Sequence, residues 1–118
     1  MNKTAIIFGG AGYIGSNLLN YLIDNNIFDK YYVFDIKPLI NFEDELKSNK
    51  VEFKNIDVRN EIDIYLDELD KVNSWIFNFA AIHREPGHGY NEYFDTNIPG
   101  AENVNDFARN TGIKNIFF

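Results

Sequence analysis

The sequence predicts an α/β fold in which helices cover both faces of a parallel sheet. Short apolar runs alternate with helical patterns along the chain, glycine or polar residues close most of these runs, and no segment repeats. Apolar runs of this length are typical of parallel strands that are buried on both faces, and the crossovers between such strands are right-handed. We therefore expect one domain over residues 1–118, built as a three-layer sheet.

Strands are expected where a short apolar run meets a turn signal, over residues 4–8, 31–34, 51–56, 74–79 and 114–118. Helices are expected where apolar residues recur at helical spacing or a cap precedes them, over 13–24, about 42–47, about 60–69 and about 91–110. The helix over 60–69 is predicted because Asn60 is a favourable N-cap and Asp63 follows three residues later. Gly112 is the expected stop of the last helix, whose apolar face is formed by Phe94, Ile98, Ala101, Val104 and Ala108.

Composition and charge narrow the classes of function. The chain is 45% hydrophobic and 16% aromatic, which supports a packed core, and 18 acidic against 11 basic residues give a net charge of −7. Because no cluster of Lys or Arg interrupts this balance, nucleic acid and anionic membranes are poor candidate partners. The absence of cysteine excludes disulfides and thiolate chemistry. With no signal-peptide pattern and no apolar run near the ~20 residues that span a bilayer, we expect a cytoplasmic protein.

A glycine turn, Gly9-Gly10-Ala11-Gly12-Tyr13-Ile14-Gly15, connects the first predicted strand to the first predicted helix. Gly9 permits a tight turn, and Gly15 lets the helix lie close to the strand. Without a side chain at Gly12, a pyrophosphate can approach the backbone and the helix N-terminus, whose free N–H groups and dipole favour anions. Tight packing alone is the other explanation for such a turn. Asp35, at the end of the next strand and 20 residues after Gly15, favours a dinucleotide site.

Asp35 also bears on which dinucleotide binds. A carboxylate at this position accepts hydrogen bonds from both hydroxyls of the adenosine ribose, and it repels a 2′-phosphate. The sequence therefore favours NAD over NADP. Lys37 could reach toward a phosphate and weaken this preference, but a solvated loop lysine is the favoured interpretation.

The chain resembles the extended short-chain dehydrogenases/reductases, especially the NAD-dependent epimerase/dehydratase group that acts on nucleotide sugars. Residues 9–16 resemble the opening signature of that group, and Asp57-Val58-Arg59 is similar to its Asp-hydrophobic-Arg/Thr step. The resemblance implies a truncated Rossmann-type sheet of about five strands in the order 3-2-1-4-5, with NAD as cofactor. It implies that Asp57 holds the adenine amino group and that the backbone at Val58 lines the adenine pocket. It also places NAD against the turn residues Gly9, Gly12, Tyr13, Ile14 and Gly15.

Two further matches belong to the nicotinamide half of the implied site. Asn78-Phe79-Ala80-Ala81 resembles the family's His-Leu-Ala-Ala, with Asn78 in place of the usual His. The small residues Ala80 and Ala81 then let the nicotinamide-side ribose approach. Residues 97–104 are similar to Asn-Val-x-Gly-Thr-x-Asn-Leu, in which Asn97 would support the active-site water and the catalytic lysine. Pro99 offers another reason for a polar residue there, because it cannot donate the usual helical hydrogen bond.

The catalytic Tyr-x-x-x-Lys pair of the family is absent. In the family the lysine and the cofactor lower the tyrosine pKa so that it acts as a base near neutral pH. None of the seven tyrosines is followed by a lysine four residues later. We therefore expect a chain that is inactive alone, whether it is an N-terminal fragment of a longer enzyme or a natural short product. The apolar strand over 114–118 would expose an edge, so we expect a homo-oligomer.

The loop over residues 83–90 and the overall function leave alternatives open. His83, Arg84 and His88 lack a third well-placed ligand, so no metal site is predicted, while contact with a diphosphate or sugar stays open. An NAD-dependent nucleotide-sugar epimerase or dehydratase is the leading function, with a nucleotide sugar as the partner of the complete protein. A non-catalytic dinucleotide sensor is the second candidate. A different Rossmann protein such as a methyltransferase is the third, but the helix of Asn97 would then have no purpose.

Overall fold

One parallel sheet of five strands forms the centre of the chain. The structure is a computed structural model that describes residues 1–80 and 90–118, with the backbone alone over 90–99. The strands follow the spatial order β3-β2-β1-β4-β5, and each neighbouring pair is parallel. Their bounds are β1 Thr4–Phe8, β2 Lys30–Asp35, β3 Val51–Asn55, β4 Trp75–Asn78 and β5 Asn115–Phe117. The predicted strands and the order 3-2-1-4-5 are confirmed.

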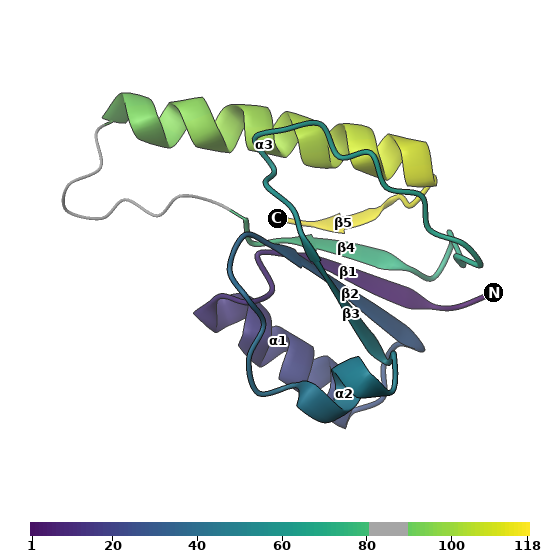
Figure 1. Cartoon of the computed structure of the whole chain (residues 1–118). Helices are drawn as coiled ribbons and strands as arrows, with labels where there is room; N and C mark the ends of the chain where they lie inside the picture. Colours follow the sequence, from purple (N-terminus) through teal and green to yellow (C-terminus); the bar gives the residue numbers. More distant parts are fainter. Residues whose placement is uncertain (81–89) are drawn as a thin grey trace.

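Helices lie on both faces of this sheet, as predicted (Figure 1). On one face are α1, Tyr13–Asp24, and the short α2, Glu43–Lys47; on the other is α3, Tyr90–Thr111. α3 ends where expected, since Gly112 takes a φ of +83° and its N–H donates to the carbonyl of Ala108 at 2.9 Å. Within the described residues, no helix is both long enough and apolar enough to cross a bilayer.

The core consists of two apolar clusters, one on each face of the sheet. On the α3 face the rings of Phe8, Phe34 and Phe107 meet edge to face, with centroids 5.2 to 5.9 Å apart. Burying one such side chain stabilises the fold by roughly 1.5–3 kcal/mol. The predicted apolar face of α3 is confirmed at Val104 and Ala108, and Phe107 extends it. Phe94 and Ile98 lie outside the described side chains.

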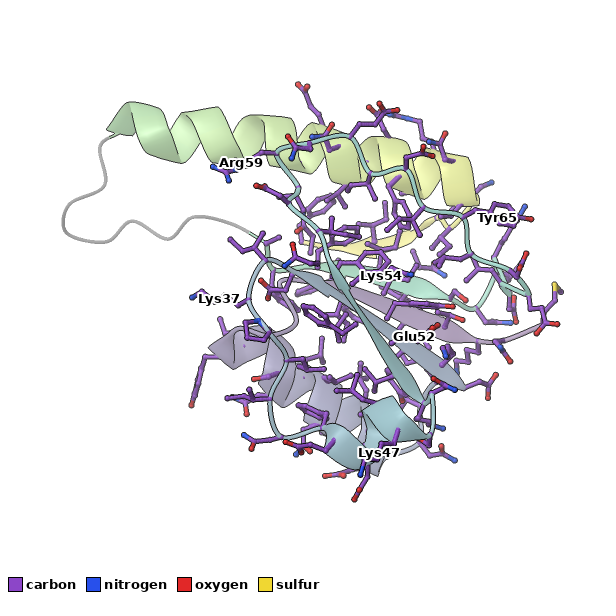
Figure 2. All side chains as sticks on the ribbon, viewed as in Figure 1. Lys37, Lys47, Glu52, Lys54, Arg59 and Tyr65 are labelled. Atoms are coloured by element: carbon purple, nitrogen blue, oxygen red, sulfur yellow. The ribbon has the colours of Figure 1, made fainter. Side chains whose placement is uncertain are left out.

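The helix predicted over 60–69 is wrong, because this stretch is irregular and largely extended. The apolar residues Ile62, Ile64 and Leu66 recur every second position, and all three side chains turn toward the cluster under α3. Tyr65 lies between them and is 86% exposed, projecting from the outside of the segment (Figure 2). A period of two is that of extended chain, so the apparent N-cap at Asn60 was outweighed by burial.

Candidate functional site

The carboxyl ends of four strands meet at one edge of the sheet, and backbone hydrogen bonds extend the ladder past the strand ends. The Gly9 N–H donates to the carbonyl of Phe34 at 2.8 Å, and the Phe79 N–H donates to that of Phe8 at 2.8 Å. The Ile56 N–H donates to the carbonyl of Asp35 at 3.1 Å. The glycine turn, Asp35, the segment after β3 and Ala80 are thereby brought to a common edge, where open α/β sheets bind their ligands.

Two glycines of the turn are required by the chain's own packing. Gly9 has a φ of +74°, and a Cβ built on it would lie 2.6 Å from the carbonyl carbon of Phe79. A Cβ on Gly15 would lie 2.5 Å from the carbonyl oxygen of Gly9, so only glycine lets α1 begin this close to the turn. Both neighbours are backbone atoms, which cannot move aside without displacing a strand end.

Gly12 differs from these two glycines. It has a φ of −76° and a ψ of 177°, which any residue adopts, and a Cβ on it would only reach ordinary contact with the Gly9 carbonyl at 3.4 Å. Nothing in the described chain requires a glycine there. Gly12 is the N-cap of α1, and the next two side chains, Tyr13 and Ile14, are 85% and 56% exposed. The helix N-terminus thus combines open space, free backbone N–H groups and exposed apolar side chains.

Asp35 contacts the glycine turn directly. Its Oδ2 accepts the N–H of Ala11 at 2.9 Å, and its Oδ1 accepts the N–H of Lys37 at 3.1 Å. Each carboxylate oxygen keeps further acceptor capacity for a ligand hydroxyl. Sequence spacing placed Asp35 and the turn at the same edge but gave no signal of the hydrogen bond to Ala11.

Asp57 is held by Arg59, which projects from the segment after β3 beside α3 (Figure 2). The Arg59 Nε donates to both carboxylate oxygens at 3.0 Å, Nη2 donates to Oδ2 at 2.5 Å, and the backbone N–H donates to Oδ1 at 3.0 Å. The hydrogen bonds from the guanidinium hold the pKa of Asp57 below its usual range and raise the pKa of Arg59. The sequence predicts that Asp57 binds the adenine, and the pairing of Asp57 with Arg59 was missed. An arginine two residues after the acid was the signal that could have indicated it.

The side chain of Val58 lies in the core instead of facing the sheet edge. It is 8% exposed and packs under α3, where its carbonyl accepts the Nδ2–H of Asn103 at 2.7 Å. Asn103 stands inside the same motif as Asn97, and the residues predicted for the site do not include it.

The nicotinamide side of the expected site is described only in part. The Ala80 N–H donates to Oδ1 of Asn78 at 3.1 Å, and Ala80 is partly buried beside the core. Ala81, together with His83, Arg84 and His88, lies outside the described residues. The backbone of Asn97 belongs to α3, but its side chain is not described. Across residues 1–80 and the described side chains of α3 and β5, no three acidic or histidine side chains are grouped as metal ligands.

The sheet order and the glycine turn define a Rossmann-type α/β protein. Residues 6–118 match the sequence model of the 3-beta hydroxysteroid dehydrogenase/isomerase family, and the chain belongs to that family. The predicted resemblance to extended short-chain dehydrogenases/reductases of the epimerase/dehydratase type is confirmed.

Individual relatives extend this comparison. A UDP-glucose 4-epimerase of Rickettsia bellii is 32% identical over 111 residues, which cover 88% of this chain and 32% of the relative. The crystal structure of ADP-L-glycero-D-manno-heptose-6-epimerase from Helicobacter pylori aligns with a TM-score of 0.67 and 26% identity, over 92% of this chain and 36% of that one. The dTDP-glucose 4,6-dehydratase of Bacillus anthracis, solved in complex with NAD, shares the fold with a TM-score of 0.61 and 23% identity, over 91% of this chain and 34% of that one. The chain thus spans about a third of the length of these relatives.

Proposed function

We propose that this chain is the NAD-binding part of an NAD-dependent nucleotide-sugar epimerase or dehydratase. The observation that carries the proposal is Gly12, a glycine that packing among the described residues does not require, at the N-cap of a helix that starts at the ligand-binding edge of the sheet. A diphosphate at this position would meet free N–H groups and the positive end of the helix dipole. NAD supplies hydride transfer when it is bound, and the chain supplies the binding groups.

The proposed site divides between the two halves of the dinucleotide. The turn residues would hold the pyrophosphate, Asp35 the adenosine ribose, and Asp57 with the backbone of Val58 the adenine. Ala80 and Ala81 would flank the ribose of the nicotinamide half, and Asn97 would support the catalytic groups. We assign this binding role to residues 1–118 as one domain.

The cofactor and the substrate class rest on different supports. The carboxylate of Asp35 favours NAD over NADP, and the related dehydratase of Bacillus anthracis was solved with NAD. The substrate class rests on the named relatives, which are epimerases and a dehydratase of nucleotide-linked sugars. A homo-oligomeric state, a cytoplasmic location and the lack of binding to nucleic acid stay predictions.

Calorimetric titration of the 118-residue chain with NAD and with NADP tests the proposal. We expect NAD to bind more tightly, and Gly12→Val to abolish binding while the unfolding midpoint stays close to that of the wild type, because the valine side chain fills only the space left for the pyrophosphate. Asn17→Val, on an exposed position of the same helix, is the matched control and should leave the affinity unchanged. Tight binding of NAD by Gly12→Val would refute the pyrophosphate site.

A non-catalytic dinucleotide-binding module is the second candidate. The 118 residues contain no Tyr-x-x-x-Lys and span about a third of the named relatives, so both candidates fit them. Both candidates predict that the chain binds NAD but does not turn over a nucleotide sugar by itself. A polypeptide that continues past Phe118 into a Tyr-x-x-x-Lys pair would decide for the enzyme, and turnover by the 118-residue chain alone would refute the prediction of inactivity.

A further inference from the structure

The contact between α3 and the segment after β3 involves two α3 residues that the proposed function does not use for binding, together with Val58, whose backbone it does use. Val58 in that segment faces Gly100 and Asn103 of α3, which are three residues apart and therefore lie on the same side of the helix. More than 40 residues of chain separate Val58 from its two partners, so the contact is purely tertiary.

The hydrogen bond from Asn103 satisfies a backbone acceptor that strand pairing does not use. The side-chain amide of Asn103 donates to the Val58 carbonyl at 2.7 Å in a partly buried setting. Buried carbonyls are nearly always paired, and here a side chain provides the partner at a point where the chain has left β3. Removal of the amide would therefore free the backbone at Val58 to move.

Gly100 sets how closely α3 approaches the same residue. A Cβ built on Gly100 would lie 3.0 Å from Cγ2 of Val58, closer than ordinary van der Waals contact. Gly100 is itself buried. Any larger residue at position 100 must push Val58 or lift the helix, so glycine keeps the helix and the segment at their observed distance.

Val58 lies between Asp57 and Arg59, the ion pair at the sheet edge. On the other side of Asp57, the Ile56 N–H is bonded to the carbonyl of Asp35. Asp57 is therefore held from both directions, through Ile56 by β2 and through Val58 by α3. These two anchors fix the backbone from which the Asp57 carboxylate projects, and Arg59 holds the carboxylate itself.

We infer that Asn103 and Gly100 are positioning residues, which fix the Asp57 segment at the adenine end of the dinucleotide site. The inference rests on the proposed function, since it assumes that Asp57 faces the adenine. It also makes α3 the element that joins the adenine side to Asn97, which lies about two turns earlier on the same helix.

Two variants with a rescue test the inference on the full chain. Asn103→Leu keeps a similar volume but lacks the donor, and we expect its affinity for NAD to fall about tenfold. The affinity of Gly100→Ala for NAD should fall by a similar factor. The double variant that adds Val58→Ala should bind NAD within about twofold of Val58→Ala alone, since the methyl group at position 100 then has room. The rescue identifies the contact with Val58 as the source of the loss, and a control of matched stability separates positioning from a general loss of stability.

A stability-matched control and a ligand-free measurement complete the experiment. Ile113→Val alters the same core cluster next to β5 and should lower the unfolding midpoint without weakening NAD binding. Hydrogen exchange at the amides of Arg59 and Asn60, both bonded to Asp57, should speed up about tenfold in Asn103→Leu and not in Ile113→Val. If Asn103→Leu bound NAD with wild-type affinity, or if Ile113→Val lost as much affinity as Asn103→Leu, the inference would be overturned and the proposed function would stand. Failure of the wild type to bind NAD would overturn the proposed function and the inference with it.

Discussion

Two segments leave the same edge of the sheet and behave differently. The turn after β1 passes directly into α1, as the sequence predicts, whereas the stretch after β3 runs extended over the core although a helix was predicted there. The first is determined mainly within about a dozen residues, by the positive φ of Gly9, by Gly15 and by the apolar face of the helix, although Gly9 also leaves room for the distant Phe79. The second is determined by partners far along the chain, because Ile62 packs in the cluster under α3 and Leu69 pairs with Asn2. Local sterics can be read from a sequence, whereas a distant partner cannot.

The largest effect is expected where the turn is tightest. Gly15→Ala places a Cβ within 2.5 Å of the Gly9 carbonyl oxygen and 2.8 Å of the Gly10 Cα, so we expect a loss of unfolding free energy on the order of 3 kcal/mol. Gly12→Ala adds the same atom where it meets only ordinary contact, and its effect should stay within about 1 kcal/mol. Urea denaturation of both variants measures the difference, and equal losses of unfolding free energy would show that Gly15 is not a tighter constraint than Gly12.

The extended conformation after β3 can be tested by two neighbouring residues. Ile64→Ala removes a partly buried side chain and should cost about 2 kcal/mol, whereas Tyr65→Ala removes an exposed ring and should change the unfolding free energy by no more than about 0.5 kcal/mol. A helix over 60–69 would instead place Tyr65 near the face shared by Ile62 and Leu69. If Tyr65→Ala lost more unfolding free energy than Ile64→Ala, denaturant unfolding would therefore support a helix over residues 60–69.

Asp35 joins the turn to β2, and replacing its carboxylate should lower the unfolding free energy moderately. In Asp35→Asn the amide oxygen can accept only one of the two backbone N–H groups with good geometry, while the NH₂ faces the other. We expect a loss of about 1 kcal/mol and faster hydrogen exchange at the Ala11 amide. Asp24→Asn, exposed at the end of α1, is the matched control and should leave that amide unchanged. Unaltered exchange in Asp35→Asn would mean that the carboxylate does not brace the turn.

The smallest effect concerns the ion pair after β3. Because Arg59 lowers the pKa of Asp57 below the usual value of 3.8, the pair stabilises the folded state above that value, and this contribution is lost as the pH falls through the lower folded pKa. The Arg59 side chain is 56% exposed and that of Asp57 26%, so screening by solvent keeps the contribution small. The difference in unfolding free energy between wild type and Arg59→Gln should be constant from about pH 5 to 8 and shrink below about pH 4. An NMR titration should show the Asp57 pKa rising in Arg59→Gln, and a constant value would contradict the pairing.

Much of the candidate site follows from residues that lie close together in sequence. The glycine spacing and Asp35 at the end of the next strand were sufficient to predict which residues share the sheet edge. Gly12 in particular was predicted from its chemistry, and the structure adds that its neighbours leave the space open. The hydrogen bond from Ala11 to Asp35 was not predictable, because it depends on how far the turn leans toward β2.

The sequence by itself determined the order of the elements, the parallel sheet and the glycine turn, because each depends on backbone sterics or on apolar periodicity over a few residues. Only the tertiary structure decided that residues 60–69 stay extended, that Val58 faces the core and that Asn103 holds its carbonyl. These features arise when groups more than 30 residues apart compete for the same buried surface. The energy of such contacts outweighs a local helix signal of about 1 kcal/mol, and no local pattern records it.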